Sequence, residues 1–284
     1  DGLLLSNPVV RAQQADAVGA LAGAAGEKAR ITNCGVYIDT QAADYSPERL
    51  DMQDFTGETG QYGVSGRGAV GGLIGYATTD LRRGANISTC FAAVPVYGNL
   101  SGASGNRAGA GGLVGYGEGG RFKNCYASGF VAAVGCVGEN TPAWENNYLG
   151  LTEAASETMG AGGFVGTGHG CRFENCFATG NVTGDAASVG GFIGVMGYDT
   201  RSGDRKTKFL RCYALGDAKF ENLHGSFSGV NAVFGEAPQG APGTSAQGIL
   251  YQNCYYLSKY LPDTEIQGYT STYCAQSAAY DALQ

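Results

Sequence analysis

The sequence is short of positive charge, of long apolar runs and of histidine. Its 284 residues include 18 Lys and Arg against 25 Asp and Glu, which gives a formal net charge of −7. A chain this poor in basic residues is expected to lack the basic stripe that binds phosphates or anionic lipid, so we expect no nucleic acid partner. No apolar run approaches the roughly 18 residues of a membrane-spanning helix, and we expect no membrane insertion. With only two histidines, imidazole-based catalysis has few options.

The sequence also lacks the local signatures of common cofactor and catalytic sites. It contains no Walker loop, no Gly-x-Ser-x-Gly nucleophile elbow and no His-Glu-x-x-His zinc motif. Segment 115–120 spells Gly-x-Gly-x-x-Gly, but an expected strand follows it where a dinucleotide site needs a helix. His169, Cys171 and Cys176 form the only close group of soft metal ligands, and no fourth ligand is evident. We therefore expect no cofactor and no metal site.

Glycine, in contrast, is abundant and recurs in a fixed pattern. It occupies 49 of 284 positions without the every-third-residue period of collagen. Four segments share the pattern Gly-Gly-[Leu/Phe]-[Val/Ile]-Gly, and two weaker copies fit the same frame. The six copies are 18–23, 70–75, 110–115, 161–166, 189–194 and 230–235. The paired glycines of the four clear copies are Gly71, Gly72, Gly111, Gly112, Gly162, Gly163, Gly190 and Gly191.

Each glycine copy is followed by a second element, in which a cysteine stands three residues after an aromatic or β-branched residue. A third element follows in the clearest copies, for example Gly129-Phe-Val131. Each unit therefore predicts three short strands separated by turns. The first glycines of the four clear copies stand at 71, 111, 162 and 190. Such variable spacing favours a solenoid with insertions at its corners over a propeller with blades of about 40 to 50 residues.

The pattern Gly-Gly-[Leu/Phe]-[Val/Ile]-Gly followed by Asn-Cys-[Tyr/Phe]-Ala resembles the GLUG motif over residues 18–256. The resemblance implies a parallel β-helix within a large secreted or surface protein of bacteria. Such proteins include immunoglobulin A peptidases, in which the repeats lie outside the catalytic domain. Ala20 replaces a glycine in the first copy, and Asn231 and Ala232 replace both in the last. These terminal copies are expected to be caps or distorted turns.

We therefore predict an all-β chain that forms a right-handed parallel β-helix (β-solenoid) of about six coils with loop insertions; a β-propeller is the alternative. Residues 1–284 are expected to form a single domain of a larger surface protein, with repeats over 18–256 and a C-terminal cap or tail over 257–284. Residues at one repeat position should stack in ladders about 4.8 Å apart. Ile74, Val114, Val165 and Ile193 should form one such ladder in a single parallel sheet.

The odd spacing within the second element predicts a bend. Phe122 and Cys125 would point to opposite faces of a straight strand, so both can face the interior only if the chain turns between them. An asparagine precedes the cysteine in four copies, and asparagine tolerates the left-handed conformation that turns a corner. The asparagines are Asn33, Asn124, Asn175 and Asn253, and the alanines expected to face inward beyond the bend are Ala92, Ala127, Ala178 and Ala214. The glycine pair would supply either a second corner or a close approach of two backbones.

The repeated cysteines are expected to be buried, unoxidised and structural, because a thiol behaves as a small hydrophobe in a crowded corner. They are Cys34, Cys90, Cys125, Cys176, Cys212 and Cys254. Cys136, Cys171 and Cys274 lie outside this ladder and are expected in loops or the tail. These three are favoured for any disulfide that forms.

The inserts are expected to carry recognition, because loops on a rigid scaffold commonly do so. The longest insert, about 135–159, holds the only tryptophan, Trp144, with Glu145, Asn147 and Tyr148 beside it. Such a set can stack on and hydrogen-bond a sugar or a peptide. The alternative is that Trp144 packs as the local core of its own insert.

We expect a non-catalytic, adhesin-like binding or spacer module at the bacterial cell surface or outside the cell, with a host or bacterial surface glycan or protein as partner. The alternative is a carbohydrate-active β-helix enzyme, either a polysaccharide lyase or a glycosidase. Hydrolysis would need two neighbouring carboxyl groups. The outward position between the aromatic residue and the cysteine provides one acid. Its residues along the repeats are Thr32, Ser88, Lys123, Glu174, Leu210 and Gln252.

Overall fold

The computed structural model consists of short parallel strands and turns wherever the chain is described. It describes residues 1–26, 28–46, 62–78, 85–100, 108–135, 159–184, 189–197, 207–216, 218–220, 234–236, 249–252 and 255–256. Within these residues the strands form five parallel sheets, here named A to E. No helix long and apolar enough to cross a membrane occurs in this part of the chain.

Each sheet is built from strands that are distant in sequence. Sheet A contains β1 (Leu4–Ser6), β6 (Gly35–Tyr37), β11 (Phe91–Ala93), β16 (Tyr126–Ala127), β21 (Phe177–Ala178), β26 (Tyr213–Ala214) and β30 (Tyr255–Tyr256). Sheet B contains β2 (Val9–Ala12), β7 (Gly63–Arg67), β12 (Val96–Asn99), β17 (Val131–Val134), β22 (Val182–Gly184) and β27 (Ala218–Phe220). Sheet C contains β3 (Ala17–Gly19), β8 (Ala69–Gly71), β13 (Gly109–Gly111), β18 (Gly160–Gly162) and β23 (Val189–Gly190).

The remaining strands form two further sheets. Sheet D contains β4 (Ala22–Ala25), β9 (Ile74–Ala77), β14 (Val114–Glu118), β19 (Val165–His169), β24 (Ile193–Gly197) and β28 (Phe234–Glu236). Sheet E contains β5 (Arg30–Thr32), β10 (Asn86–Ser88), β15 (Arg121–Lys123), β20 (Arg172–Glu174), β25 (Thr207–Leu210) and β29 (Ile249–Gln252). The chain visits A, B, C, D and E in turn and then returns to A, so one coil is one circuit of the five sheets.

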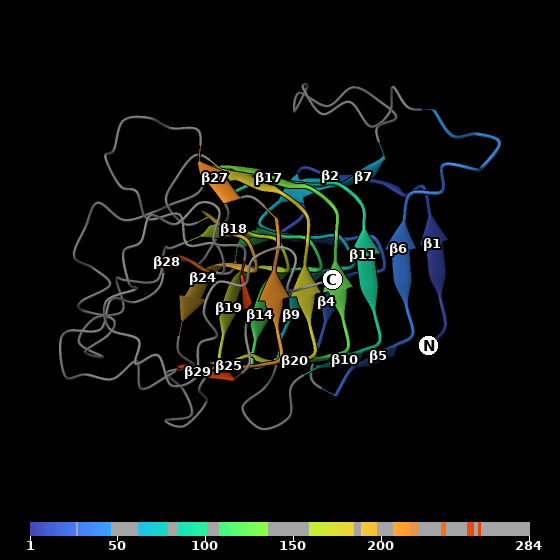
Figure 1. Cartoon of the computed structure of the whole chain (residues 1–284). Helices are drawn as coiled ribbons and strands as arrows, with labels where there is room; N and C mark the ends of the chain where they lie inside the picture. The colour runs from blue at the N-terminus through green and yellow to red at the C-terminus, as the bar shows by residue number, and fades with distance from the viewer. Residues whose placement is uncertain are drawn as a thin grey trace.

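This arrangement is a parallel β-helix, and it excludes the propeller. Figure 1 shows β1, β6 and β11 side by side, with sheet B along one edge of the stack and sheet E along the opposite edge. The predicted ladder is confirmed, because Val114 pairs in register with Ile74 and Val165, and Val165 pairs with Ile193. The first coil begins at β1, earlier in the chain than the repeat at residue 18 indicated.

The prediction of three strands per unit is wrong, because each of the first two elements is split by a corner of its own. The glycine motif contributes one strand to sheet C and one to sheet D, so it does not lie in a single sheet. The second element contributes one strand to sheet E and one to sheet A. Together with the third element in sheet B, these make five strands per coil.

Sheets C and D touch backbone to backbone, and glycine makes this contact possible. A Cβ atom added to Gly71 would lie 2.7 Å from the amide nitrogen of Gly115, and one added to Gly111 would lie 2.6 Å from that of Gly166. From the other side, a Cβ on Gly115 would lie 2.6 Å from the carbonyl carbon of Ala69. Real Cβ atoms essentially never approach backbone this closely. The motif therefore makes both a corner and a close approach, which sequence alone left open.

Larger side chains fill the space between sheets D and E. The residue after each glycine pair is fully buried, and in two coils it is Phe164 or Phe192, whose rings stack 4.8 Å apart. Phe173 of sheet E meets both rings edge to face, at 5.7 Å and 5.2 Å. Aromatic pairs in these geometries contribute about 0.5–1.5 kcal/mol each beyond the apolar area they bury. Two interlocked ladders of aromatic rings thus hold neighbouring coils in register.

The predicted bend between sheets E and A is confirmed. Asn33, Asn124 and Asn175 have φ values of 54°, 53° and 52°, in the left-handed region. Thr89 and Arg211 adopt the same conformation at 54° and 53°, although neither is an asparagine. Because of the bend, the residues on both sides of it point inward, including the predicted alanines Ala92, Ala127, Ala178 and Ala214.

The glycine contact between sheets C and D predicts a strong effect of one added methyl group. We expect Gly115→Ala to lower the free energy of unfolding by about 3 kcal/mol or more, because the methyl group would overlap backbone atoms of β8. Gly26→Ala is the matched control, since a Cβ there meets nothing within 4 Å, and we expect a change within about 0.5 kcal/mol. Chemical denaturation of both variants measures the difference. Equal stability of the two would contradict the close approach.

Candidate binding surface on sheet E

The outer face of sheet E carries two columns of side chains that run along the stack of coils. Strand alternation buries the central residue of each strand, such as Phe122 in β15, and turns its two neighbours outward. The outward residues that precede the buried one form the first column, and those that follow it form the second. The second column contains the outward residues that the sequence singled out.

Four of the six described positions of the first column are cations, and the other two are Asn86 and Leu250. Arg121 pairs in register with Arg172, and Arg172 pairs with Lys208. Arg30 lies two strands from Arg121, with Asn86 between them. We call Arg30, Arg121, Arg172 and Lys208 the basic column. The expectation that this acidic chain has no basic stripe is therefore wrong, because the fold gathers a few scattered cations on one face.

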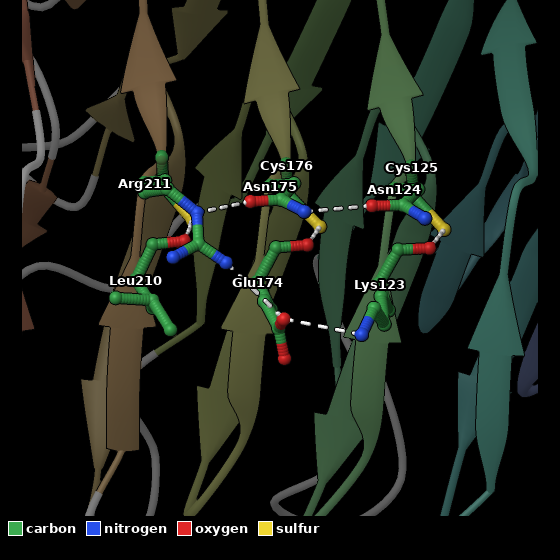
Figure 2. A network of polar contacts seen from close by, with 9 residues as sticks. Lys123, Asn124, Cys125, Glu174, Asn175, Cys176, Leu210 and Arg211 are labelled. Atoms are coloured by element: carbon green, nitrogen blue, oxygen red, sulfur yellow. Dashed lines mark hydrogen bonds and ion pairs between the residues drawn. The ribbon is translucent and has the colours of Figure 1, made fainter.

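The side chains of the basic column form no ion pair within the described residues, whereas those of the second column do. Glu174 lies 3.2 Å from Lys123 Nζ and 3.2 Å from Arg211 Nη2, and Figure 2 shows it between the two cations. The hydrogen bond from Lys123 and the nearby positive charges lower the pKa of Glu174. We call Lys123, Glu174 and Arg211 the paired cluster. Glu174 is thus an ionised partner of two cations near neutral pH.

A shallow depression of about 290 Å³ lies between strands β10, β15 and β20. Its floor is formed by the buried Ile87 and Phe122. Its polar lining consists of Asn86, Ser88, Arg121, Lys123, Arg172 and Glu174. The depression therefore offers amide, hydroxyl and guanidinium groups together, with the basic column along one side.

The bend beside this face is closed by a repeated thiol hydrogen bond. The thiols of Cys34, Cys90 and Cys125 each donate to the carbonyl oxygen two residues earlier, at 3.2 Å, and Cys176 does so at 3.3 Å. The Sγ atom of Cys90 also accepts a hydrogen bond from the amide of Cys34, at 3.5 Å. The same carbonyl oxygens also accept backbone amides of the neighbouring coil, so each thiol adds a second hydrogen bond to an oxygen at the bend.

The cysteines among the described residues are all buried, and none of them is in a disulfide. They are Cys34, Cys90, Cys125, Cys171, Cys176 and Cys212. Cys171 lies in the turn between β19 and β20, as expected, but its side chain is fully buried, and burial raises its pKa to about 12. Burial also raises the pKa of Cys176 well above its usual value. Cys136, Cys254 and Cys274 lie outside the described residues.

Sheet A carries a ladder of aromatic rings on its outer face, next to the bend. Phe91, Tyr126, Phe177 and Tyr213 stack almost parallel, with centroids 5.0, 5.0 and 4.9 Å apart. Each ring is partly exposed, but its flat faces are covered by its neighbours in the ladder. The ladder stabilises the stack of coils and leaves mainly ring edges for contact with solvent. Alignment of the repeats could have predicted this ladder, since an aromatic residue follows every repeated cysteine except Cys34.

The remaining candidates from sequence are the residues around Trp144 and the group of His169, Cys171 and Cys176. Trp144, Glu145, Asn147 and Tyr148 lie outside the described residues. His169 packs against Tyr116 with ring centroids 5.4 Å apart, and its neighbours Cys171 and Cys176 are buried in the core. No group of three or more His, Cys, Asp or Glu that could hold a metal ion occurs in the described part of the chain.

The family model of the GLUG motif matches residues 106–132 and 157–183. Each match contains strands of sheets C, D, E and A and ends at the start of a sheet B strand, so one motif corresponds to about one coil. No curated protein and no solved structure matches the chain. The chain is thus a GLUG-motif repeat protein, in which the motif glycines form the contact between sheets C and D.

The buried thiols predict slow alkylation of the native protein. We expect iodoacetamide at neutral pH to leave the peptides of Cys171 and Cys176 unmodified, because buried thiols are inaccessible and thiolate is scarce when the pKa is raised. The same peptides should be modified after denaturation without reductant. Mass spectrometry of both samples gives the answer, and rapid alkylation of these cysteines in the native protein would contradict the inward register.

Proposed function

We propose that the chain is a non-catalytic binding module of an extracellular or cell-surface bacterial protein, with the β-helix as scaffold and the outer face of sheet E as the binding surface. The observation that carries the proposal is the basic column, which lies in register beside the depression and forms no ion pair within the described residues. Charged groups that a protein leaves exposed and unpaired along one line are available to a partner.

The scaffold suits this role because the surface is held by strands and not by loops. Arg121 and Arg172 each belong to a strand whose central residue is a buried phenylalanine, and those two rings stack 5.1 Å apart. The core therefore fixes the backbone positions from which the two cations project. A preorganised surface loses little conformational entropy when a ligand binds.

The carbohydrate-active enzyme is the alternative, and it could use the same surface. Hydrolysis needs one carboxyl group that can donate a proton and a second carboxylate nearby. Glu174 is the one acid that lines the depression, and its pKa is lowered by Lys123, so it is a poor proton donor. This argues for binding without hydrolysis. A lyase or glycosidase would reveal itself by shortening its ligand.

The location and context of the module rest on the family. The chain resembles GLUG-repeat regions of large secreted and surface proteins of bacteria. A stack of coils can also act as a spacer that projects neighbouring domains.

The insert that carries Trp144 remains a second predicted recognition element on this scaffold. Trp144→Ala is expected to change the free energy of unfolding by no more than about 1 kcal/mol if the side chain serves recognition. A loss above about 3 kcal/mol would indicate instead that Trp144 is the core of its insert.

The proposed function predicts binding without turnover. We expect the purified chain to retain at least one ligand on an array of glycans and matrix proteins, because the exposed cations and polar groups of sheet E are rigidly placed. Size-exclusion analysis of that ligand after prolonged incubation should give an unchanged chain length. Absence of binding to every arrayed molecule would contradict the proposal, and a shortened ligand would establish the enzyme in its place.

A further inference from the structure

We propose that the basic column binds a linear acidic polysaccharide that carries a carboxylate on successive sugars and lies along the axis of the coils. This inference rests on the proposed function and adds the chemistry of the partner. It concerns the basic column and the polar side chains that share its depression.

The first argument is that like charges are stacked here with no ion pair among the described residues. Arg121, Arg172 and Lys208 occupy directly paired positions on neighbouring strands. Like charges in such positions destabilise a sheet. One column away, Glu174 compensates Lys123 and Arg211. The same sheet thus pairs one set of cations with an acid and leaves the other without an ion pair among the described residues, which is the arrangement expected if an external anion completes it.

The second argument is the spacing of the charges. Neighbouring strands lie about 4.8 Å apart, so Arg121, Arg172 and Lys208 present positive charge at that interval. From Arg30 to Lys208 the column extends over four such intervals, or about 19 Å. A small anion could contact two of these cations at most. An extended polysaccharide, whose sugar units repeat at a similar interval, can contact all of them at once.

The third argument concerns the groups that surround the cations. A guanidinium group binds a carboxylate through two parallel hydrogen bonds, and Arg121 and Arg172 can each offer such a pair. Asn86 and Ser88 line the same depression and provide an amide and a hydroxyl group. Sugar hydroxyls both donate and accept hydrogen bonds, so these neutral groups suit them. The surface thus matches a polymer that alternates carboxylate and hydroxyl groups.

The surface suits a single-stranded nucleic acid less well. Proteins that bind single strands without base pairing combine positive charge with aromatic faces on which the bases stack. The nearest exposed rings in the described structure are those of sheet A, and their faces are covered by one another. An acidic polysaccharide is therefore the partner that the structure favours.

Binding to polygalacturonate tests the inference, with neutral dextran and single-stranded DNA as comparison ligands. The test variant is Arg121→Gln/Arg172→Gln. The matched control is Arg11→Gln/Arg67→Gln, which removes the same charge from sheet B on the opposite edge of the stack. Thermal unfolding of both variants establishes that they fold. We expect the test variant to melt no lower than the wild type, since it loses no ion pair within the described residues.

We expect the wild type to bind polygalacturonate but not dextran, with an affinity that falls as salt is added. The test variant should bind at least tenfold more weakly, and the control should bind within about twofold of the wild type.

Equal losses in the two folded variants, or no binding of polygalacturonate by the wild type at low salt, would overturn the inference. Tighter binding of DNA through the same arginines would replace the polysaccharide with a nucleic acid. If other arrayed ligands still bind, only this inference fails; if none does, the proposed function fails with it.

Discussion

The close contact between sheets C and D is the constraint on which the rest of the coil depends. At Gly71, Gly111 and Gly115 the two backbones come so near that a Cβ atom would overlap main-chain atoms. Because sheets C and D pack closely against each other, five short strands are enough to complete one coil. The bulky side chains are buried between sheets D and E. The glycines of the GLUG motif are thus positions of contact and not simply flexible turns.

Much of this architecture could be predicted from sequence, since the repeat exposes its own geometry. The odd interval from Phe122 to Cys125 predicted a bend, and the left-handed φ of Asn124 is that bend. The same conformation at Thr89 and Arg211 could not be predicted from their residue types. There the stacked coils above and below impose the turn, and local preference is overridden. The number of strands was underestimated because two residues between corners suffice for pairing in a stack, as in β16 and β21.

The candidate surface was missed for a related reason. Arg121 and Arg172 are far apart in sequence, and the overall composition is acidic, so the charge count argued against any basic stripe. The cations of the column stand directly before the buried residue at the centre of each strand of sheet E. The outward residues singled out from the sequence stand directly after it. In a β-helix, a surface property belongs to one column of the repeat and not to the composition of the chain. Residues in the long inserts have no counterpart in the repeat sequence, so their arrangement cannot be predicted from it.

Amide hydrogen exchange tests the central claim most directly, namely that the glycine motif is the most tightly packed part of each coil. The amides of Gly72, Gly112 and Gly163 donate to carbonyl groups of the neighbouring coil at 3.2, 3.1 and 3.1 Å. If sheets C and D are packed backbone to backbone, peptides containing these amides should exchange only through global unfolding. They should then be among the slowest in the protein, and their exchange should accelerate with denaturant in parallel with unfolding. Rapid exchange of these glycine peptides while the peptides of sheet E stay protected would contradict the account.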